Sequence, residues 1–331
     1  DSRCVRELYV RYLCATDLWY PGPAGYEVRT LCDPLGLGSN LIAVGYSDAE
    51  GAAAATEIIL DRLDDPIPHL AELRPTRLPL TDGEAEQIRT KPLQAEAWQV
   101  ANDYCGNRGY YHYLTGDREV GEVYRRSWEA IVEAGYERTA QVVAPHLRSL
   151  DQFVNWRFVE HMGLFNDEER LKITRFLYGL AESKEGWLHV QNCPRVKPGV
   201  PRQNHELIPA LGMAMMADYF ETHFPDAPGP DRWREAAAQC FEPYGASWKP
   251  LCDGLCHGWW MSQPSILNYA LLDPDHRFLT EGGARSAAEC ALAIVNNQGW
   301  MPNAGDADLR RAFPAESLRV AAGHFSDGRY R

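Results

Sequence analysis

The sequence predicts a mainly α-helical protein with a small α/β domain at its N-terminal end. Two observations indicate this. After residue 90, apolar residues recur at i, i+3 and i+4 through most of the chain, which is typical of amphipathic helices. Before residue 65, short runs of β-forming residues alternate with turn residues and one alanine-rich stretch. We therefore expect an α/β domain at 1–65, a linker at 66–90 and a helical domain at 91–331.

The N-terminal domain is expected to contain two strands and one helix. Residues 5–14 mix β-formers with an apolar run, which favours a strand. Pro and Gly punctuate residues 21–38, which indicates a loop. Residues 41–46 form a short apolar run, and the Ser-Asp pair that follows can cap a helix from 49 to about 63. A strand, a cap and an alanine-rich helix make half of a βαβ unit.

The helical domain is expected to consist of antiparallel helix pairs. The linker before it holds four prolines between Asp64 and Asp82. Later connections are mostly short and rich in Gly, Pro, Asn and Asp, which is typical of helical hairpins. The expected helices span residues 92–115, 117–135, 147–163, 167–184, 204–223, 230–242, 259–272 and 282–298.

Composition and charge limit the class of protein. The chain has 331 residues and is 45% hydrophobic, which is enough for a substantial core. It has no run of about 18 apolar residues, so we expect no membrane span. A net charge of −13 argues against broad binding of nucleic acid. Nine cysteines and a start that resembles a mature terminus after signal removal favour a secreted or periplasmic location.

Three motifs between about residues 160 and 306 resemble the helical toroid domain of heparinase-type and alginate-lyase-type polysaccharide lyases. In the first, an Asn-His pair opens a helix rich in Ala and Met. In the second, an Asp-Gly turn precedes a pair of tryptophans and a further helix. The third is a Pro-x-x-Gly-Asp turn. These motifs read Gln203-Asn204-His205-Glu206; Cys252-Asp253-Gly254, Gly258-Trp259-Trp260 and Asn268-Tyr269-Ala270-Leu271; and Pro302-Asn303-Ala304-Gly305-Asp306.

The resemblance implies an (α/α) toroid that cleaves an acidic polysaccharide or oligosaccharide next to a uronic acid by β-elimination. Asn204 would neutralise the uronate carboxylate, and His205 would act as a base or orient the substrate. Family members usually place a Tyr after the Asp-Gly turn, whereas this chain reads Gln263-Pro264-Ser265-Ile266. Tyr269, Tyr110 or Tyr111 is therefore expected to supply the proton.

Further polar and aromatic residues are expected to bind the substrate. They are Arg202, Trp259, Trp260, His257, Glu160, His161 and Tyr110. No cofactor and no metal is expected, because Cys252, Cys256 and His257 lack a clear fourth ligand for zinc. Trp156 is expected in the core.

Several alternatives stay open. Asn204 is equally well explained as a helix cap, Tyr110 and Tyr111 as packing residues, and Glu160 with His161 as a solvated helix end. The chain could instead be a glycoside hydrolase that uses Asp253 with Glu160 or Glu206, or a glycan-binding fragment without activity. About eight helices are too few for a closed toroid, so a longer polypeptide with a C-terminal β-sandwich region after Arg331 is also expected.

Overall fold

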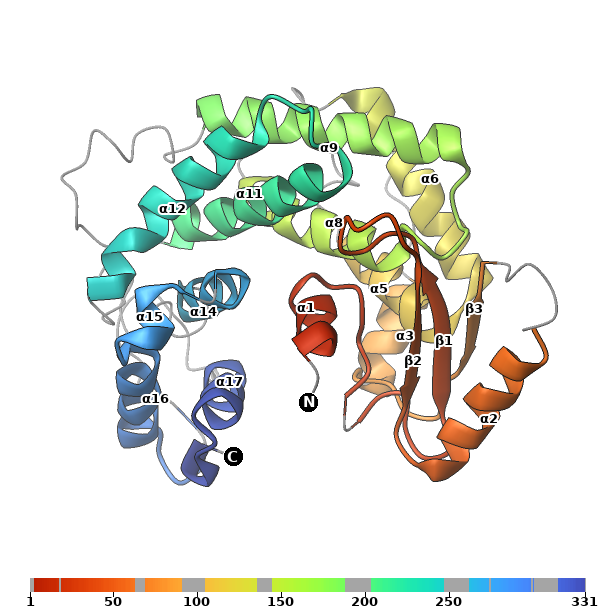
Figure 1. Ribbon diagram of the computed structural model, residues 1–331, viewed down its shortest axis with the longest axis horizontal. Coiled ribbons are helices and arrows are strands. Elements are labelled where there is room, and N and C mark those ends of the chain that lie inside the picture. The colour runs from red at the N-terminus through yellow and green to blue at the C-terminus, as the bar shows by residue number, and fades with distance from the viewer. Residues whose placement is uncertain are drawn as a thin grey trace. The chain divides into compact units, whose positions relative to one another are not determined.

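The computed structural model describes residues 3–17, 19–62, 69–90, 105–135, 145–187, 204–246, 262–273, 275–298, 300 and 315–330. The chain divides into two compact units, Asp1–Leu180 and Ala181–Arg331, which we call the N-terminal and the C-terminal unit. The described residues are mainly helical, with one small sheet (Figure 1). None of the described helices is long and apolar enough to cross a membrane.

The sheet of the N-terminal unit has three antiparallel strands, β1 (Tyr26–Leu31), β2 (Leu41–Tyr46) and β3 (Ala71–Arg74). Their order is β2-β1-β3, so β1 is the central strand. Val28 at its centre lies opposite Val44 on β2 and Glu72 on β3. Since β2 and β3 both run antiparallel to β1, they are parallel to each other, and α2 connects them. The expected βαβ unit is therefore present as β2-α2-β3, with β1 inserted between its two strands.

Three differences from the sequence prediction occur in this unit. The strand expected at 5–14 is wrong, because Arg3–Val10 form helix α1, with Leu8 buried. The loop expected at 21–38 contains β1, and the linker expected at 66–90 contains β3 and helix α3 (Asp82–Thr90). β1 lacks an alternating apolar pattern because charged residues are buried in it.

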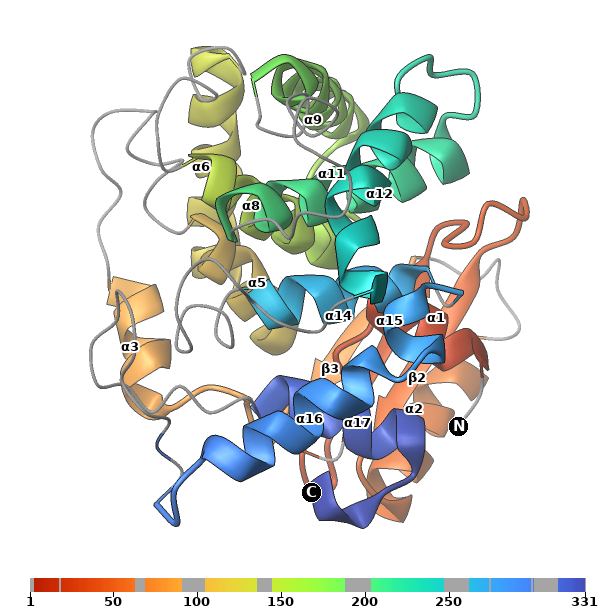
Figure 2. The same ribbon diagram turned by 90° about the vertical axis from the view of Figure 1, so that its left-hand side faces the viewer.

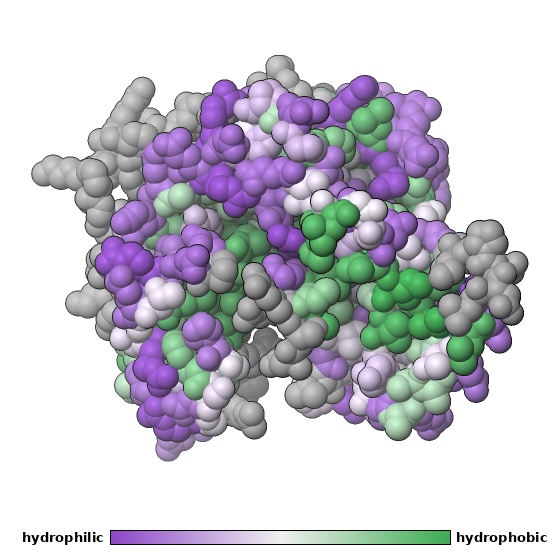
Figure 3. Space-filling model, viewed as in Figure 1, coloured by the Kyte–Doolittle hydropathy of each residue, from purple (hydrophilic) through white to green (hydrophobic). Residues whose placement is uncertain are grey.

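Helix α2 (Ala49–Leu60) begins where the sequence predicts. Asp48 caps it, since its carboxylate accepts a hydrogen bond of 2.9 Å from the Gly51 N–H. The helix packs through Ala55 on the sheet face that carries Val28. Tyr46 at the end of β2 is exposed, and hydrophobic surface is visible over this part of the sheet (Figure 3).

Four further helices described in the N-terminal unit confirm the helices that the apolar periodicity predicts. They are α5 (Cys105–Thr115), α6 (Arg118–Ala134), α8 (Pro145–Val159) and α9 (Asp167–Trp187), which continues into the C-terminal unit. Their core is aromatic: Trp128 meets Trp156 edge to face at 6.1 Å between ring centroids, and Phe165 packs on Trp156. Trp156 is fully buried, which confirms its assignment to the core.

The C-terminal unit is built around a helix that is apolar on all sides. The residues of α11 from Leu207 to Phe220 are almost all buried, which is the pattern of a central core helix. α12 lies alongside α11 (Figures 1 and 2). The elements are α11 (Asn204–His223), α12 (Pro230–Ala246), α14 (Gln263–Leu272), α15 (Arg277–Thr280), α16 (Gly283–Ile294), α17 (Ala315–Phe325) and the short helix η3 (Gly328–Tyr330).

Candidate functional site

The Asn-His motif opens helix α11, as the sequence predicts. Asn204 and His205 are its first two residues, and Glu206 follows in its first turn. The first turn of a helix has unpaired backbone N–H groups and the positive end of the helix dipole, both of which favour an anion. The side chains of Asn204 and His205 lie outside the described part of the structure, as do all of Arg202, Cys252, Asp253, Cys256, His257, Trp259 and Trp260.

Tyr269 lies on α14 in the same unit. Its ring is buried and stacks on Phe241 of α12, with 4.1 Å between centroids and 10° between planes. Burial, reinforced by the charge of Asp273, raises the pKa of Tyr269 to about 12. The phenol therefore stays protonated at neutral pH, so no phenolate is present to act as a base.

His276 contacts this tyrosine, and the sequence analysis did not select it. The two rings meet edge to face at 5.3 Å between centroids. The Nδ1 atom of His276 accepts the Phe278 N–H at 3.3 Å and so caps α15. Burial lowers the pKa of His276, which keeps the imidazole neutral over a wider pH range. A histidine two residues after an Asp-Pro pair resembles an ordinary loop residue, so only the contact with Tyr269 draws attention to it.

Tyr110 and Tyr111 lie on α5 in the N-terminal unit. Asn155 accepts the backbone N–H of Tyr110 at 2.7 Å, and the Tyr110 ring packs on Phe158. Burial raises the pKa of Tyr110 to about 12 and also raises that of Tyr111. Both side chains have packing roles. Their expected convergence with Asn204 on one cleft involves both units and stays a prediction.

Glu160 and His161 are buried where α8 ends, so the alternative of a solvated helix end is wrong. The Glu160 carboxylate lies 3.0 Å from an Arg157 guanidinium nitrogen and 3.7 Å from one of Arg170. Its Oε2 atom is 3.9 Å from Nε2 of His161. Ion pairing with buried arginine holds this carboxylate in place, because leaving one charge unpaired in the interior would be strongly destabilising.

Cys32 and His69, which the sequence analysis did not select, adjoin this cluster. Burial raises the pKa of the Cys32 thiol, while the nearby Arg170 opposes the shift. Burial also lowers the pKa of His69, and a hydrogen bond with the His161 backbone partly opposes this shift. A raised thiol pKa does not favour the thiolate, so Cys32 is not an activated nucleophile. The cluster therefore joins the ends of β1, β3 and α8, and its geometry indicates a structural role.

A second buried ion pair lies at the centre of the sheet. Arg29 donates from Nε to Glu27 at 2.7 Å, and both side chains are almost fully buried. Arg29 also donates to the backbone carbonyl of Tyr113 on α5, and its guanidinium lies 3.7 Å from the centre of the Tyr113 ring. Thr16 donates to the other carboxylate oxygen of Glu27. Through the contacts of Arg29 with Tyr113, this pair connects the sheet to helix α5.

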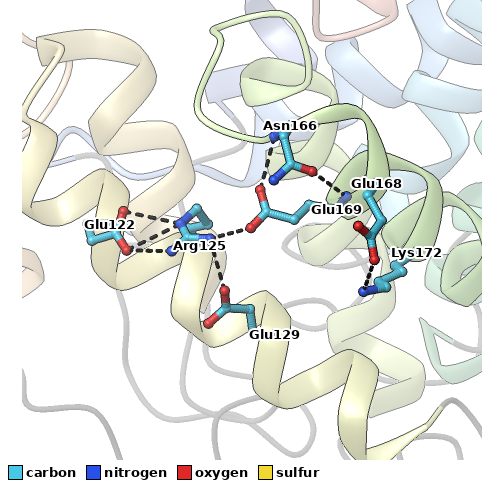
Figure 4. Close-up of polar contacts among 7 residues, drawn as sticks. All are labelled: Glu122, Arg125, Glu129, Asn166, Glu168, Glu169 and Lys172. Carbon is cyan, nitrogen blue, oxygen red and sulfur yellow. Dashed lines mark hydrogen bonds and ion pairs between the residues drawn. The ribbon is translucent and has the colours of Figure 1, made fainter.

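A cavity of about 340 Å³ lies between α6 and α9 in the N-terminal unit. At its edge, Arg125 is held by the carboxylates of Glu122, Glu129 and Glu169 (Figure 4). Glu169 also forms a reciprocal cap with Asn166, with two hydrogen bonds of 3.0 Å. Sequence reasoning missed the cavity because Glu and Arg at i, i+3 and i+4 are typical of a solvated helix face.

No group of three His, Cys, Asp or Glu residues that could hold a metal ion occurs within the described ranges. Comparisons with protein-family models, with curated proteins and with solved structures found no match. The case for a function therefore depends on the residues of this chain.

Proposed function

We propose that the chain belongs to a polysaccharide lyase that cleaves a uronic-acid-containing polymer by β-elimination, with its helices forming part of an (α/α) toroid. The observation that carries the proposal is the start of α11 at Asn204. The Asn-His motif thereby stands at the N-terminus of a buried central helix, where backbone dipoles favour a carboxylate.

The reaction assigns one task to each residue of the motif. The Asn204 amide donates a hydrogen bond to the uronate carboxylate and stabilises the charge that develops as the C5 proton leaves. His205 takes that proton, and the electron pair of the C–H bond forms the new C4–C5 double bond. The bond from C4 to the glycosidic oxygen breaks, and the leaving oxygen takes a proton. Arg202 adds positive charge on the substrate side of the motif.

Tyr269 is the best described candidate for the proton donor. It lies in the same unit as the Asn-His motif, and its raised pKa keeps the hydroxyl protonated. Almost no phenolate is present at neutral pH, so we assign proton abstraction to His205 and proton donation to Tyr269. We include in this proposal a secreted or periplasmic location, where such polymers occur.

The test is incubation with a panel of uronate polymers, followed by two readouts. The unsaturated product of β-elimination absorbs in the ultraviolet, and every chain cleavage creates one reducing end. A lyase makes both signals rise in step. Reducing ends without absorbance would instead mean hydrolysis, and binding without either signal would mean a glycan-binding fragment; each of these results contradicts the proposal.

A further inference from the structure

Strand β2 forms one edge of the sheet in the N-terminal unit. In the central strand β1, the Thr30 N–H donates to the Leu70 carbonyl at 2.8 Å, on the side of β3. Successive residues of a strand direct their backbone groups to opposite sides, so Thr30 does not bond to β2. Thr30 lies opposite Ile42. The N–H and C=O groups of Ile42 therefore point away from β1, as do those of Val44 and Tyr46.

These outward backbone groups are open to a partner. Within the described residues, no hydrogen bond joins the backbone of Ile42, Val44 or Tyr46 to a segment on the outer side of β2. Val44 is 39% exposed and Tyr46 is 50% exposed, so this edge of the sheet is accessible. A row of unpaired N–H and C=O groups selects an extended strand, because a strand presents matching groups at the same spacing.

The two edges of the sheet differ in their protection against such pairing. Charged side chains and proline are the usual means by which an edge strand avoids a second strand. β3, at the other edge, carries the exposed Glu72 and Arg74. β2 reads Leu-Ile-Ala-Val-Gly-Tyr and has neither a charge nor a proline. In a chain with a net charge of −13, an uncharged strand is a place where a second copy meets little repulsion.

The side chains at this edge complement those of a second copy. Ile42, Val44 and Tyr46 share the sheet face that α2 covers. In antiparallel pairing about a two-fold axis at Val44, each Val44 lies opposite the other, and Ile42 lies opposite Tyr46 of the second copy. Aromatic and β-branched residues stabilise a sheet when they face each other. Asp48 falls opposite the neutral Asn40 in this register, so no like charges meet.

We propose that β2 pairs antiparallel with β2 of a second copy of this chain. The two three-stranded sheets then form one continuous sheet, with α2 of both copies on the same face. The proposal does not depend on the lyase reaction. A single pair of short strands buries less surface than a typical permanent dimer, so the dimer is weak and its population depends on concentration.

The first test uses the wild-type chain. In sedimentation equilibrium, the mass should rise from 37.3 kDa toward twice that value between about 1 and 300 µM. Hydrogen exchange of the β2 amides should be at least about threefold slower at the higher concentration, while exchange of the β3 amides is unchanged. A chain that stays monomeric over this range, or a dimer without protection of β2, would overturn the proposal.

The second test uses variants at the two-fold axis. Val44→Lys places two like charges opposite each other and should weaken the dimer at least about tenfold. Its matched control is Ala53→Lys, which adds the same charge at an exposed position on α2 and should leave the affinity unchanged. Val44→Thr keeps an uncharged β-branched side chain and should change the affinity less than about threefold.

Equal dimerisation of Val44→Lys and Ala53→Lys would show that β2 is not the interface. A folded Val44→Thr variant that is monomeric would contradict the proposed register. If Val44→Lys does not fold, the exchange measurement on the wild type decides between the two outcomes.

Discussion

The two units differ in what they bury. Within the described residues, every buried charged or histidine side chain belongs to the N-terminal unit; these are Glu27, Arg29, Arg108, His112, Arg157, Glu160 and His161. The buried polar residues described in the C-terminal unit are Ser262, Gln263 and Ser265, all uncharged and all at the start of α14. Its central helix α11 is lined with Ala, Leu and Met.

This difference indicates two ways of specifying a fold. In the N-terminal unit, Arg29 reaches from β1 to a backbone carbonyl of α5, and such a directional contact fixes how sheet and helices meet. In the C-terminal unit, the shape and volume of the apolar side chains around α11 fix how the helices pack. The N-terminal unit should therefore be sensitive to loss of a charge, and the C-terminal unit to loss of volume.

The largest expected effect is at the buried ion pair. Glu27→Ala leaves Arg29 buried without its carboxylate and should lower the free energy of unfolding by about 4 kcal/mol. The double variant Glu27→Leu/Arg29→Met should recover most of the loss, because it leaves no unpaired charge. Denaturant unfolding of both proteins measures the difference. If Glu27→Ala were as stable as the wild type, the N-terminal unit would not be sensitive to loss of a buried charge, and the proposed difference between the units would be wrong.

The matching change in the C-terminal unit is Met216→Ala. Met216 is buried on α11, and truncation leaves a cavity, so we expect a loss of about 3 kcal/mol. Met216→Leu conserves volume and should lose less than about 1.5 kcal/mol. Chemical denaturation again supplies the values. Equal losses for Ala and Leu would show that volume is not what stabilises this core.

A smaller effect is expected at Gly121 on α6. A Cβ atom there would lie 2.7 Å from Nδ1 of His112, which is buried and bonded to the Asp117 carbonyl. Gly121→Ala should therefore destabilise by about 1–3 kcal/mol despite the better helix propensity of alanine. Gly323→Ala on α17 is the control, since a Cβ there meets nothing within 4 Å. Thermal melts should show the control unchanged or stabilised by up to about 1 kcal/mol.

The smallest predicted effect is on pH dependence. Burial lowers the pKa of His276 in the folded state, so the unfolded chain binds its proton more readily. Stability from this residue is therefore present above its ordinary pKa of about 6.5 and is lost as the pH falls below it. His276→Asn keeps a capping side chain and removes the titration. When the pH is lowered from 7.5 to 5.5, the melting temperature should fall less for the variant than for the wild type. Equal falls in the two proteins would contradict the assignment of this pH dependence to His276.

Much of the helical architecture follows from sequence periodicity, whereas in the sheet the sequence predicts only β2, with the observed bounds Leu41–Tyr46. Helix α6 is amphipathic with a clear Asp117 cap, and its bounds nearly match the prediction. Strand β1 was missed because Glu27 and Arg29 break the apolar pattern, and their partners lie elsewhere along the chain. α1 was mistaken for a strand because its Val and Tyr residues favour strands, while packing of Leu8 decides the outcome.

The candidate site shows the same limit. The Asn-His motif predicts the start of α11 because helix capping depends on residues that are adjacent in the sequence. Glu160 is buried beside Arg170, and Cys32 and His69 lie close to this cluster. These residues are far apart in the sequence, so only the fold brings them together. Sequence patterns identify which residues can do chemistry, and contacts between distant residues decide which of them have structural roles instead.

The most direct test of the proposed function compares two asparagines at helix starts. Asn166 is a helix cap, because its side chain accepts the Glu169 N–H at 3.0 Å. Asn166→Ala should therefore lose about 1 kcal/mol of stability and keep turnover of the uronate polymer. Asn204→Ala should lose at least about 100-fold in turnover, with at most a similar loss of stability. If both variants retain turnover and lose only stability, Asn204 is a cap, and the proposal that it stabilises the β-elimination is wrong.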